Sequence, residues 1–359
     1  MEHIKEALTF DDVLLTPRYS SVLPSKTNLN INLGNNLNLK IPFLSSAMDT
    51  VTESSMAIAI AQKGGLGIIH RNLSIKEQLK EIKKVKKKNL ITGAAVGTTN
   101  EDLIRVKSIL DAGVDLIVID TAHGHSEKVI KILNKIKKIC FKTPICVGNI
   151  ATGEAAHRLY NEGADILKVG IGPGSICTTR MIAGIGMPQI TAVMEVKKSM
   201  QKKKIKIISD GGVKFSGDIV KGLAAGADAI MMGSIFAGTE ESPGKKFKHK
   251  NKFYKVYRGM GSIGAMSAGS SNRYFQKNYK DKSKFVPEGV EARVPYKGPI
   301  DEILYQLQGG LRSSMGYIGA KTIKEIQKKA RFVKITKAGF YESMVHSVET
   351  TKEKKNYKL

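Results

Sequence analysis

Three stretches of the chain repeat one pattern of residues: DAGVDLIVID (111–120), NEGADILKVG (161–170) and AAGADAIMMG (224–233). In each, a helical stretch ends in a glycine and an aspartate, and a short apolar run follows. Gly113, Gly163 and Gly226 suit the left-handed position that closes a helix, because glycine adopts it without steric cost. Continuous apolar runs rich in branched residues are typical of strands buried on both faces, as in parallel sheets.

The rest of the chain extends this alternation of helix and strand. We predict strands near 41–46, 66–69, 93–97, 115–120, 144–148, 165–169, 205–209 and 228–232. Helical patterns lie between them at 53–63, 74–87, 100–112, 126–139, 152–162, 189–200 and 215–225. Eight strands that alternate with helices predict an α/β protein, the (β/α)8 TIM barrel. A doubly wound open sheet is the alternative, and the glycine-rich segments after several strands favour the barrel.

A barrel needs about 250 residues, so the chain has a surplus. We expect one catalytic barrel domain over residues 1–359, with an N-terminal segment at 1–40 and a long excursion after the eighth strand, at about 238–298. The tip of this excursion, AMSAGSSNRYFQ (265–276), has the small residues of a moving flap. A helix at 300–316 would complete the barrel, and the tail at 335–359 is a loose end or a subunit contact.

The composition places the chain in a broad class. It has 359 residues, of which 42% are hydrophobic and 25% charged, and this apolar fraction is too high for a disordered chain. The apolar runs are far shorter than the roughly 20 residues that span a bilayer. The first residues lack the apolar core of a signal peptide. Three cysteines argue against a disulfide framework, so we expect a cytoplasmic protein with no membrane partner.

The net charge of +26 comes from 58 Lys and Arg against 32 Asp and Glu. Such a balance is typical of nucleic-acid binders. However, only ten of the 58 are arginine, the residue suited to phosphates and base edges, and the lysine clusters have few aromatic neighbours. We therefore interpret the charge as lysine-rich helix surfaces and do not expect a nucleic-acid partner.

The segment after the sixth strand, GIGPGSICTTR (170–180), carries the strongest chemical signal. Its glycines and proline predict a tight loop whose amides bind anions or whose carbonyls bind a cation. Cys177 lies in this loop, near Arg180, which favours a reactive thiolate that acts as a nucleophile. Cys140, at a helix end, and Cys146, inside a strand, are predicted to be core residues.

Glycine pairs follow the seventh and eighth strands, in SDGGV (209–213) and MGS (232–234). Barrels bind phosphate through backbone amides at these two strand ends, and Asp210 beside them suits ribose hydroxyls. We therefore predict a nucleotide-monophosphate or sugar-phosphate site. After the fourth strand, Asp120 with two histidines suits either a metal or a ribose, although a zinc site is poorly supported. Asn149, after the fifth strand, offers a hydrogen-bonding amide.

Five motifs together resemble those of the inosine-5′-monophosphate (IMP) dehydrogenase family, and the resemblance covers nearly the whole chain. They are LTFDDVLLTPRYS (8–20), SSAMDTVTES (45–54), GIGPGSICTTR (170–180), YRGMGSIGAM (257–266) and RVPYKG (293–298). The resemblance implies oxidation of IMP to xanthosine monophosphate (XMP) with NAD+, the step committed to guanine nucleotides.

The resemblance also implies a mechanism. Cys177 would attack C2 of the base, hydride would leave to NAD+, and a covalent thioimidate would remain. After NADH departs, the flap would enter the vacated site and hydrolyse the adduct, with Arg273 and Tyr274 activating water. Arginine is an unusual base, so it would need burial and a hydrogen-bonded neighbour. Thr179 and Glu288 match a second proton route.

The resemblance implies three sets of binding residues. The IMP contacts match Ser175, Asp210, Gly212, Gly233, Ser234, Tyr257, Gly259, Met260, Gly261 and Glu288. The NAD contacts match Asp120, Asn149, Gly170 and Gly172. A monovalent cation, usually K+, would be bound by Gly172, Gly174 and Cys177, and by the neighbouring subunit's residues that correspond to Glu342, Ser343 and Met344. This shared site implies a homotetramer.

The chain departs from the family in three respects. Met344 stands where a histidine is expected, and Ala292 stands where a glycine is expected. The third departure is a missing insert. A pair of CBS regulatory modules usually lies between the second helix and the third strand, and here the sequence runs through about 88–90 without it. Guanosine monophosphate (GMP) reductase resembles this family, shares the loop cysteine and also lacks the insert, so it is the alternative function. A reductase has no adduct to hydrolyse, so the presence of Arg273 and Tyr274 favours the dehydrogenase.

Overall fold

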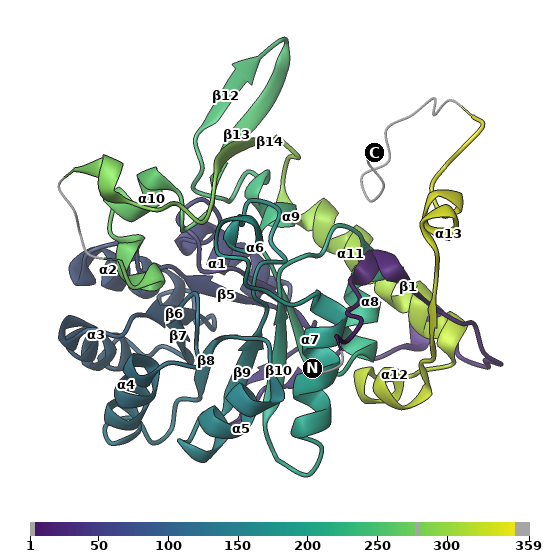
Figure 1. The fold of residues 1–359 in the computed structure, drawn as a ribbon, viewed down its shortest axis with the longest axis horizontal. Helices are drawn as coiled ribbons and strands as arrows, with labels where there is room; N and C mark the ends of the chain where they lie inside the picture. Colours follow the sequence, from purple (N-terminus) through teal and green to yellow (C-terminus); the bar gives the residue numbers. More distant parts are fainter. Residues whose placement is uncertain (1–3, 277–280, 349–359) are drawn as a thin grey trace.

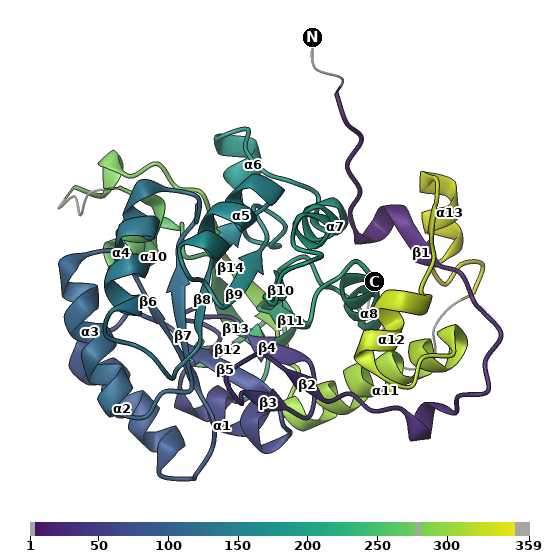
Figure 2. The ribbon, with the colours of Figure 1, turned by 90° about the horizontal axis from the view of Figure 1, so that it is seen from below.

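The computed structural model describes residues 4–276 and 281–348, and its centre is a closed barrel of parallel strands (Figures 1 and 2). In chain order the barrel strands are β4 (Phe43–Ser45), β5 (Leu66–Ile69), β6 (Gly93–Val96), β7 (Leu116–Asp120), β8 (Ile145–Ile150), β9 (Ile166–Val169), β10 (Lys206–Asp210) and β11 (Ala229–Met232). All eight lie at predicted positions. The last strand pairs with the first, with Ile230 opposite Phe43, so the barrel is confirmed and the open sheet is excluded.

Helices surround the barrel at the predicted places. They are α1 (Ser54–Gln62), α2 (Ile75–Lys86), α3 (Asn100–Asp111), α4 (Glu127–Lys137), α5 (Gly153–Asn161), α7 (Gln189–Ser199), α8 (Ser216–Ala224) and α11 (Ile300–Ile318). The last of these packs against α8 and α1, so it completes the ring, as the pattern at 300–316 predicts. Two short helices, α6 (Thr179–Ile182) and α9 (Ser234–Ala237), directly follow the loops at the ends of β9 and β11 and were not predicted.

The repeated glycine–aspartate pattern sets the register of neighbouring strands. The three glycines adopt positive φ, namely 77° at Gly113, 95° at Gly163 and 122° at Gly226. Each aspartate accepts a hydrogen bond of 2.9 Å from a backbone N–H at the start of the preceding strand, in the pairs Thr92 with Asp115, Ile145 with Asp165 and Ile207 with Asp228. The pattern therefore ends a helix and aligns the next strand with its neighbour.

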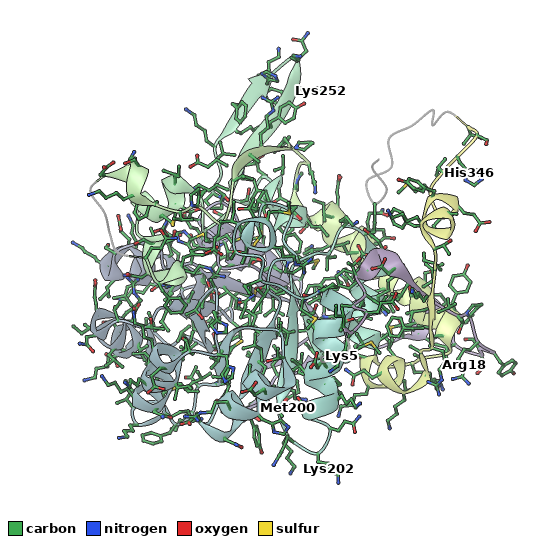
Figure 3. All side chains as sticks on the ribbon, in the orientation of Figure 1. Lys5, Arg18, Met200, Lys202, Lys252 and His346 are labelled. Atoms are coloured by element: carbon green, nitrogen blue, oxygen red, sulfur yellow. The ribbon has the colours of Figure 1, made fainter. Side chains whose placement is uncertain are left out.

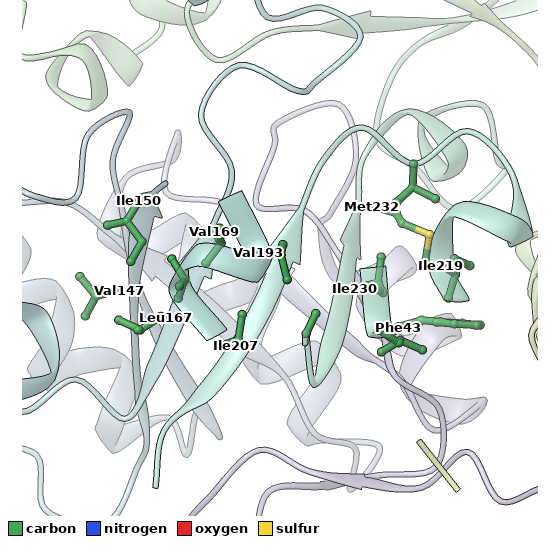
Figure 4. Close-up of a cluster of buried hydrophobic side chains, with 14 of the residues drawn as sticks. Phe43, Val147, Ile150, Leu167, Val169, Val193, Ile207, Ile219, Ile230 and Met232 are labelled. Carbon is green, nitrogen blue, oxygen red and sulfur yellow. The ribbon is translucent and has the colours of Figure 1, made fainter. Parts of the chain in front are cut away.

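The core has two layers because successive strand residues point to opposite faces. Leu116, Val118 and Ile166 belong to the cluster inside the barrel, whereas Ile117 and Ile119 belong to the cluster between the strands and the helices. Figure 4 shows part of this outer cluster. The hairpin of β2 (Ile31–Asn32) and β3 (Asn38–Leu39) adds three leucines to the inner cluster: Leu33, Leu37 and Leu39. The predicted core positions of Cys140 and Cys146 are confirmed, since both are buried.

The excursion at 238–298 is more ordered than its composition suggested. Three strands, β12 (Lys246–His249), β13 (Lys252–Arg258) and β14 (Glu291–Pro295), form an antiparallel sheet, and β12 and β13 project from the barrel as a hairpin with Lys252 near its far end (Figures 1 and 3). Between β13 and β14 lie α10 (Ile263–Ser267), η3 (Ser270–Tyr274) and η4 (Lys282–Lys284). Residues 277–280 of the excursion lie outside the described ranges.

The two ends of the chain meet on one side of the barrel. Near the N-terminus, η1 (Phe10–Asp12) leads into β1 (Val13–Leu15), which pairs with β15 (Phe332–Lys334), and η2 (Pro24–Lys26) follows. Near the C-terminus, α12 (Ile323–Lys329) precedes β15, and α13 (Lys337–Glu342) packs against η1. The predicted tail at 335–359 is thus anchored up to α13, and its last eleven residues lie outside the described ranges. Within those ranges, no helix has the length and apolarity needed to cross a membrane.

Candidate active site

A cavity of about 360 Å³ opens at the carboxyl ends of the barrel strands. Most of the predicted site residues line it: Asp120, Asn149, Gly170, Gly172, Gly174, Ser175, Cys177, Thr179, Asp210, Gly212, Gly233, Ser234, Tyr257, Gly259, Met260, Arg273, Tyr274 and Glu288. Four predicted residues are not among its lining residues, namely Gly261, Glu342, Ser343 and Met344. The fold therefore gathers these residues from the ends of β7, β8, β9, β10 and β11 and from the excursion around one space.

Cys177 lies in the loop between β9 and α6, as the sequence predicts. Its backbone N–H donates to the carbonyl of Gly174 over 3.1 Å, which closes a tight turn. Its Sγ donates to Oγ1 of Thr179 over 3.2 Å, and the side chain is only partly buried. The thiol thus lines the cavity and hydrogen-bonds the Thr179 hydroxyl, so it is within reach of a ligand bound there.

The returning end of the excursion supports this loop. The N–H of Val290 donates to the carbonyl of Ile176 and the N–H of Thr178 donates to that of Glu288, both over 3.0 Å. Cys177 and Gly289 form an antiparallel bridge between these contacts. The loop that carries Cys177 and the returning end of the excursion are hydrogen-bonded to each other. A shift of the excursion would therefore also shift the backbone at Cys177.

Arg180 supports the loop rather than contacting the thiol. Its Nε donates to the carbonyl of Ile171 over 3.3 Å, and its Nη2 donates to that of Met187 over 2.5 Å. Side chains at Gly172 and Gly186 would collide with it, since a Cβ there would lie 2.6 and 2.5 Å from its Cγ. The glycines of the loop are therefore needed for the close approach of this arginine.

Backbone turns at the ends of β10 and β11 form another wall of the cavity. Gly211 and Gly212 have φ of 91° and 83°, which only glycine adopts readily. A Cβ at Gly212 would lie 3.3 Å from the ring of Phe10, so the N-terminal segment also shapes the cavity. Sequence analysis missed this contribution of Phe10, although its motif at 8–20 was singled out. Tyr257 is buried beside Ser175, and burial raises the pKa of its hydroxyl well above the usual value.

The tip of the excursion lies inside the site. The carbonyl of Arg273 accepts a hydrogen bond of 3.0 Å from the N–H of Ala122, and the Arg273 guanidinium forms an ion pair with Asp120. The ring of Tyr274 packs against Gly261, where a Cβ would lie 2.7 Å from the ring carbon Cζ. Gly261 therefore contributes to the site indirectly, because its lack of a side chain leaves room for the ring of Tyr274.

The base of the excursion is tied to the barrel by charged side chains. Arg258, at the end of β13, donates from Nη2 to Asp49 over 2.7 Å, and Asn72 donates to the same carboxylate over 2.7 Å. Within the excursion, Glu291 on the returning strand accepts a hydrogen bond of 2.9 Å from the N–H of Gly264, which joins β14 to α10. The excursion is thus tied to the barrel at the end of β13, while its tip reaches the cavity.

The buried environment of Arg273 lowers the pKa of its guanidinium from the usual value. Tyr274 opposes this shift, and the nearby guanidinium of Arg71 adds to it. Its Nε is buried without a hydrogen-bond partner among the described residues. Burial also raises the pKa of the Tyr274 hydroxyl, which hydrogen-bonds Arg273. Burial thus favours the neutral form of this arginine, whereas the ion pair with Asp120 favours its charged form.

Lys168 is a site residue that sequence analysis missed. It lies on β9 with only 2% of its surface exposed, and its Nζ contacts Asp120 Oδ1 at 2.9 Å and Asp210 Oδ2 at 2.8 Å. Asn149 donates from Nδ2 to the same Asp210 oxygen over 3.0 Å. One feature of the sequence could have identified it, namely a charged residue inside an otherwise apolar strand. A lysine is almost never fully buried unless it is paired, so its position in a buried strand implies a charged partner.

A family comparison identifies the chain. The family model described as "IMP dehydrogenase / GMP reductase domain" matches residues 7–346. The chain belongs to the IMP dehydrogenase / GMP reductase family. Relatives described as inosine-5′-monophosphate dehydrogenase occur in Borreliella burgdorferi (48% identity; 96% of this chain and 98% of the relative), Cryptosporidium parvum (47%; 99% of each) and Aquifex aeolicus (42%; 99% and 98%). The resemblance stated on the five motifs is thereby confirmed.

Family members differ in length, and this chain is a short form. The alignment with the Aquifex aeolicus relative spans 483 positions although this chain has 359 residues, whereas the alignment with the Cryptosporidium parvum relative spans 399. In the structure α2 ends at Lys86 and β6 begins at Gly93, so only a short turn joins them. The family's CBS insert is absent at this junction, as predicted, and the barrel closes without it.

Proposed function

We propose that the protein oxidises IMP to XMP with NAD+ and water, and that Cys177 forms the covalent bond to the substrate. The single observation that carries this proposal is that one cavity holds both Cys177 and the pair Arg273 and Tyr274. A nucleophile alone would also suit GMP reduction. The buried arginine with a lowered pKa supplies a base for hydrolysis, and only the dehydrogenase reaction has a hydrolytic step.

The reaction balances as two steps at C2 of the hypoxanthine ring. The Cys177 thiol releases its proton, Sγ bonds to C2, and the hydrogen on C2 leaves as hydride, which NAD+ accepts when bound. Water then adds to C2 and the bond between carbon and sulfur breaks. One proton of the water stays on the purine ring of XMP, and the other restores the thiol. In the second step Arg273 takes the proton of the attacking water, while Thr179 and Glu288 offer a second route for it.

The substrate position follows from the cavity walls. The glycine turns after β10 and β11, with Ser175, Ser234 and Tyr257, would bind the phosphate, because backbone amides and hydroxyls suit a phosphate dianion. Asp210 would accept hydrogen bonds from the ribose. Met260, with the backbone at Gly259 and Gly261 and the side chain of Glu288, would contact the base. In this pose C2 of the base would face Cys177, which lies in the loop between β9 and α6.

The place for the dinucleotide overlaps the place of the flap tip. Asp120, which the resemblance assigns to NAD, forms its ion pair with Arg273 here. The planar, positively charged guanidinium of Arg273 therefore fits against the Asp120 carboxylate. The oxidised nicotinamide ring is also planar and positively charged, so it would suit the same position. Asn149, Gly170 and Gly172 line the same part of the cavity. Lys168 already contacts Asp120 Oδ1, so Arg273 and the dinucleotide would compete for the other oxygen of this carboxylate. The flap would therefore enter only after the dinucleotide leaves, which separates hydride transfer from hydrolysis.

The assay that tests this proposal supplies the protein with IMP, NAD+ and K+ and follows NADH and XMP together. We expect the two products in equal amounts. A parallel reaction with GMP and NADPH tests the reductase alternative. NADPH consumption there, with no NADH from IMP, would mean that the flap pair has been misinterpreted and that the alternative is correct.

We also propose a monovalent cation at the Cys177 loop. Backbone oxygens are suitable ligands for K+, and the loop from Gly170 to Cys177 presents several of them in a tight turn. The other predicted ligands, Glu342, Ser343 and Met344, follow or end α13, which packs against η1 of its own chain. One chain thus supplies half of the site, which is consistent with the proposed homotetramer in which a neighbour supplies the rest.

Replacing K+ by Na+ should lower the rate by about tenfold or more, because the smaller ion fits the loop carbonyls less well and leaves Cys177 less well positioned. Steady-state NADH formation at constant ionic strength measures the effect, and a tetramethylammonium salt provides the control without a binding cation. Equal rates in all three salts would argue against the cation site.

A further inference from the structure

The buried lysine on β9 lies between two carboxylates that the proposed function assigns to different ligands. Asp210, on β10, would bind the ribose of IMP, and Asp120, on β7, receives Arg273 of the flap. Lys168 Nζ lies 2.8 Å from the first carboxylate and 2.9 Å from the second, and it also donates to the side-chain amide oxygen Oδ1 of Asn149. One ammonium group therefore joins the substrate end of the cavity to the flap end.

The alternation of side chains along each strand explains how Lys168, Asp120 and Asp210 come to lie at one level inside the barrel. Residues two apart on a strand point to the same face, so Lys168 points inward with Ile166, and Asp120 points inward with Val118. Asp210 follows Ile208 in the same way. The inner apolar cluster ends where these charged groups begin, so they form the floor of the cavity above an apolar core.

The carboxylates of Asp120 and Asp210 need the positive charge of Lys168 between them. Asp120 and Lys168 are 5% and 2% exposed, so water screens them little, and like charges repel strongly under such conditions. Removal of one partner from a buried ion pair leaves the other uncompensated, which costs more than the pair itself contributes. Without the ammonium, the two carboxylates would face each other across the position it occupies.

We propose that Lys168 is a positioning residue whose charge holds Asp210 and Asp120 together, so that the IMP site stays formed whether the flap is docked or withdrawn. This inference rests on the proposed function. When Arg273 leaves Asp120, Lys168 is the remaining cation that contacts this carboxylate among the described residues. Asp210 then keeps its orientation toward the ribose because its partner has not moved.

The other titratable groups around this floor do not replace Lys168. Cys146, on β8, is buried inside the barrel, and burial raises the pKa of its thiol to about 12, so it stays neutral. Tyr257 and Tyr274, whose pKa values are also raised by burial, stay neutral too. Cys177 and Glu288 line the same cavity and carry no cation. Only Arg273 brings a second positive charge to either carboxylate in the described part of the chain.

A double-mutant cycle tests the proposal through IMP affinity, measured by calorimetry on the full-length protein with K+ and without NAD+. The variants are Lys168→Met, Asp120→Asn and the two combined, with Lys168→Arg as the matched control that keeps the charge. We expect Lys168→Met to weaken IMP binding by about tenfold or more, and Asp120→Asn alone to change it by less than about threefold. In the Lys168→Met background, Asp120→Asn should recover most of the lost affinity, because it removes the uncompensated charge.

The pattern of recovery separates electrostatic positioning from packing. If the double variant binds IMP as weakly as Lys168→Met, or more weakly, Lys168 acts by filling space and the proposal is wrong. Loss of IMP binding in Lys168→Arg would contradict it as well. If Lys168→Met does not fold, the same cycle with Lys168→Gln gives the answer. Failure of the unmodified protein to bind IMP would instead contradict the proposed function itself.

Discussion

Substitution of Cys177 by alanine should abolish NADH formation, with a loss of about 10⁴-fold or more in turnover, while IMP still binds within a few-fold of its normal affinity. The loss is large because no other group in the cavity can form the bond to C2, and removal of a nucleophile typically removes most of the catalytic effect. Binding survives because most of the proposed phosphate and ribose contacts lie outside the Cys177 loop, at the ends of β10 and β11 and on β13. Product formation and calorimetry with IMP measure the two effects separately.

Cys140→Ala provides the matched control for this experiment. Cys140 is a free cysteine buried at the end of α4, and its thiol donates to the carbonyl of Thr143, away from the cavity. We expect its removal to leave turnover unchanged. If Cys177→Ala retained normal turnover, the covalent mechanism would be wrong, however well the substrate pose fits.

Substitution of Arg273 by alanine should slow hydrolysis by about 10² to 10⁴-fold, the usual contribution of a general base, and should slow hydride transfer much less. A rapid burst of NADH, equal to the enzyme concentration, would then precede slow turnover. Stopped-flow absorbance of NADH separates the two phases. Loss of the burst together with turnover would show that Arg273 acts before hydrolysis, which contradicts the role assigned to the flap tip.

The pH dependence of the slow phase gives a second test of the same residue. Because burial lowers the pKa of Arg273, a larger fraction of its guanidinium becomes neutral as pH rises. In the unmodified protein the hydrolysis rate should therefore increase with pH, and Arg273→Ala should lose this increase. Arg158→Ala, which removes an exposed arginine paired with Glu162 on α5, is the control and should preserve both the rate and its pH dependence.

The barrel could be predicted from the sequence because its strands are short, apolar and punctuated by the same glycine–aspartate pattern. That pattern acts locally: Gly113 ends a helix at positive φ, and Asp115 binds the N–H of Thr92 on the preceding strand. The strand pairing at the two ends of the chain could not be predicted in this way. β1 and β15 are more than 300 residues apart in the sequence, so no local signal links them.

The candidate site was predicted to different extents for different residues. Cys177 and the glycines after β10 follow strand ends directly, so the barrel fold alone brings them together. Arg273 enters through the excursion, and its place against Asp120 depends on contacts that composition does not encode. Lys168 was missed because its role depends on two aspartates from other strands, which meet it only when the barrel closes.

In the proposed reaction Cys177 carries the purine between the two steps, and trapping this adduct tests that role most directly. The Arg273→Ala variant is mixed with IMP, NAD+ and K+, quenched in acid during the slow phase, digested and analysed by mass spectrometry. We predict that the peptide containing Cys177 carries the purine nucleotide, and that the modification requires NAD+. An unmodified Cys177 peptide in a sample that has already produced its burst of NADH would contradict the account.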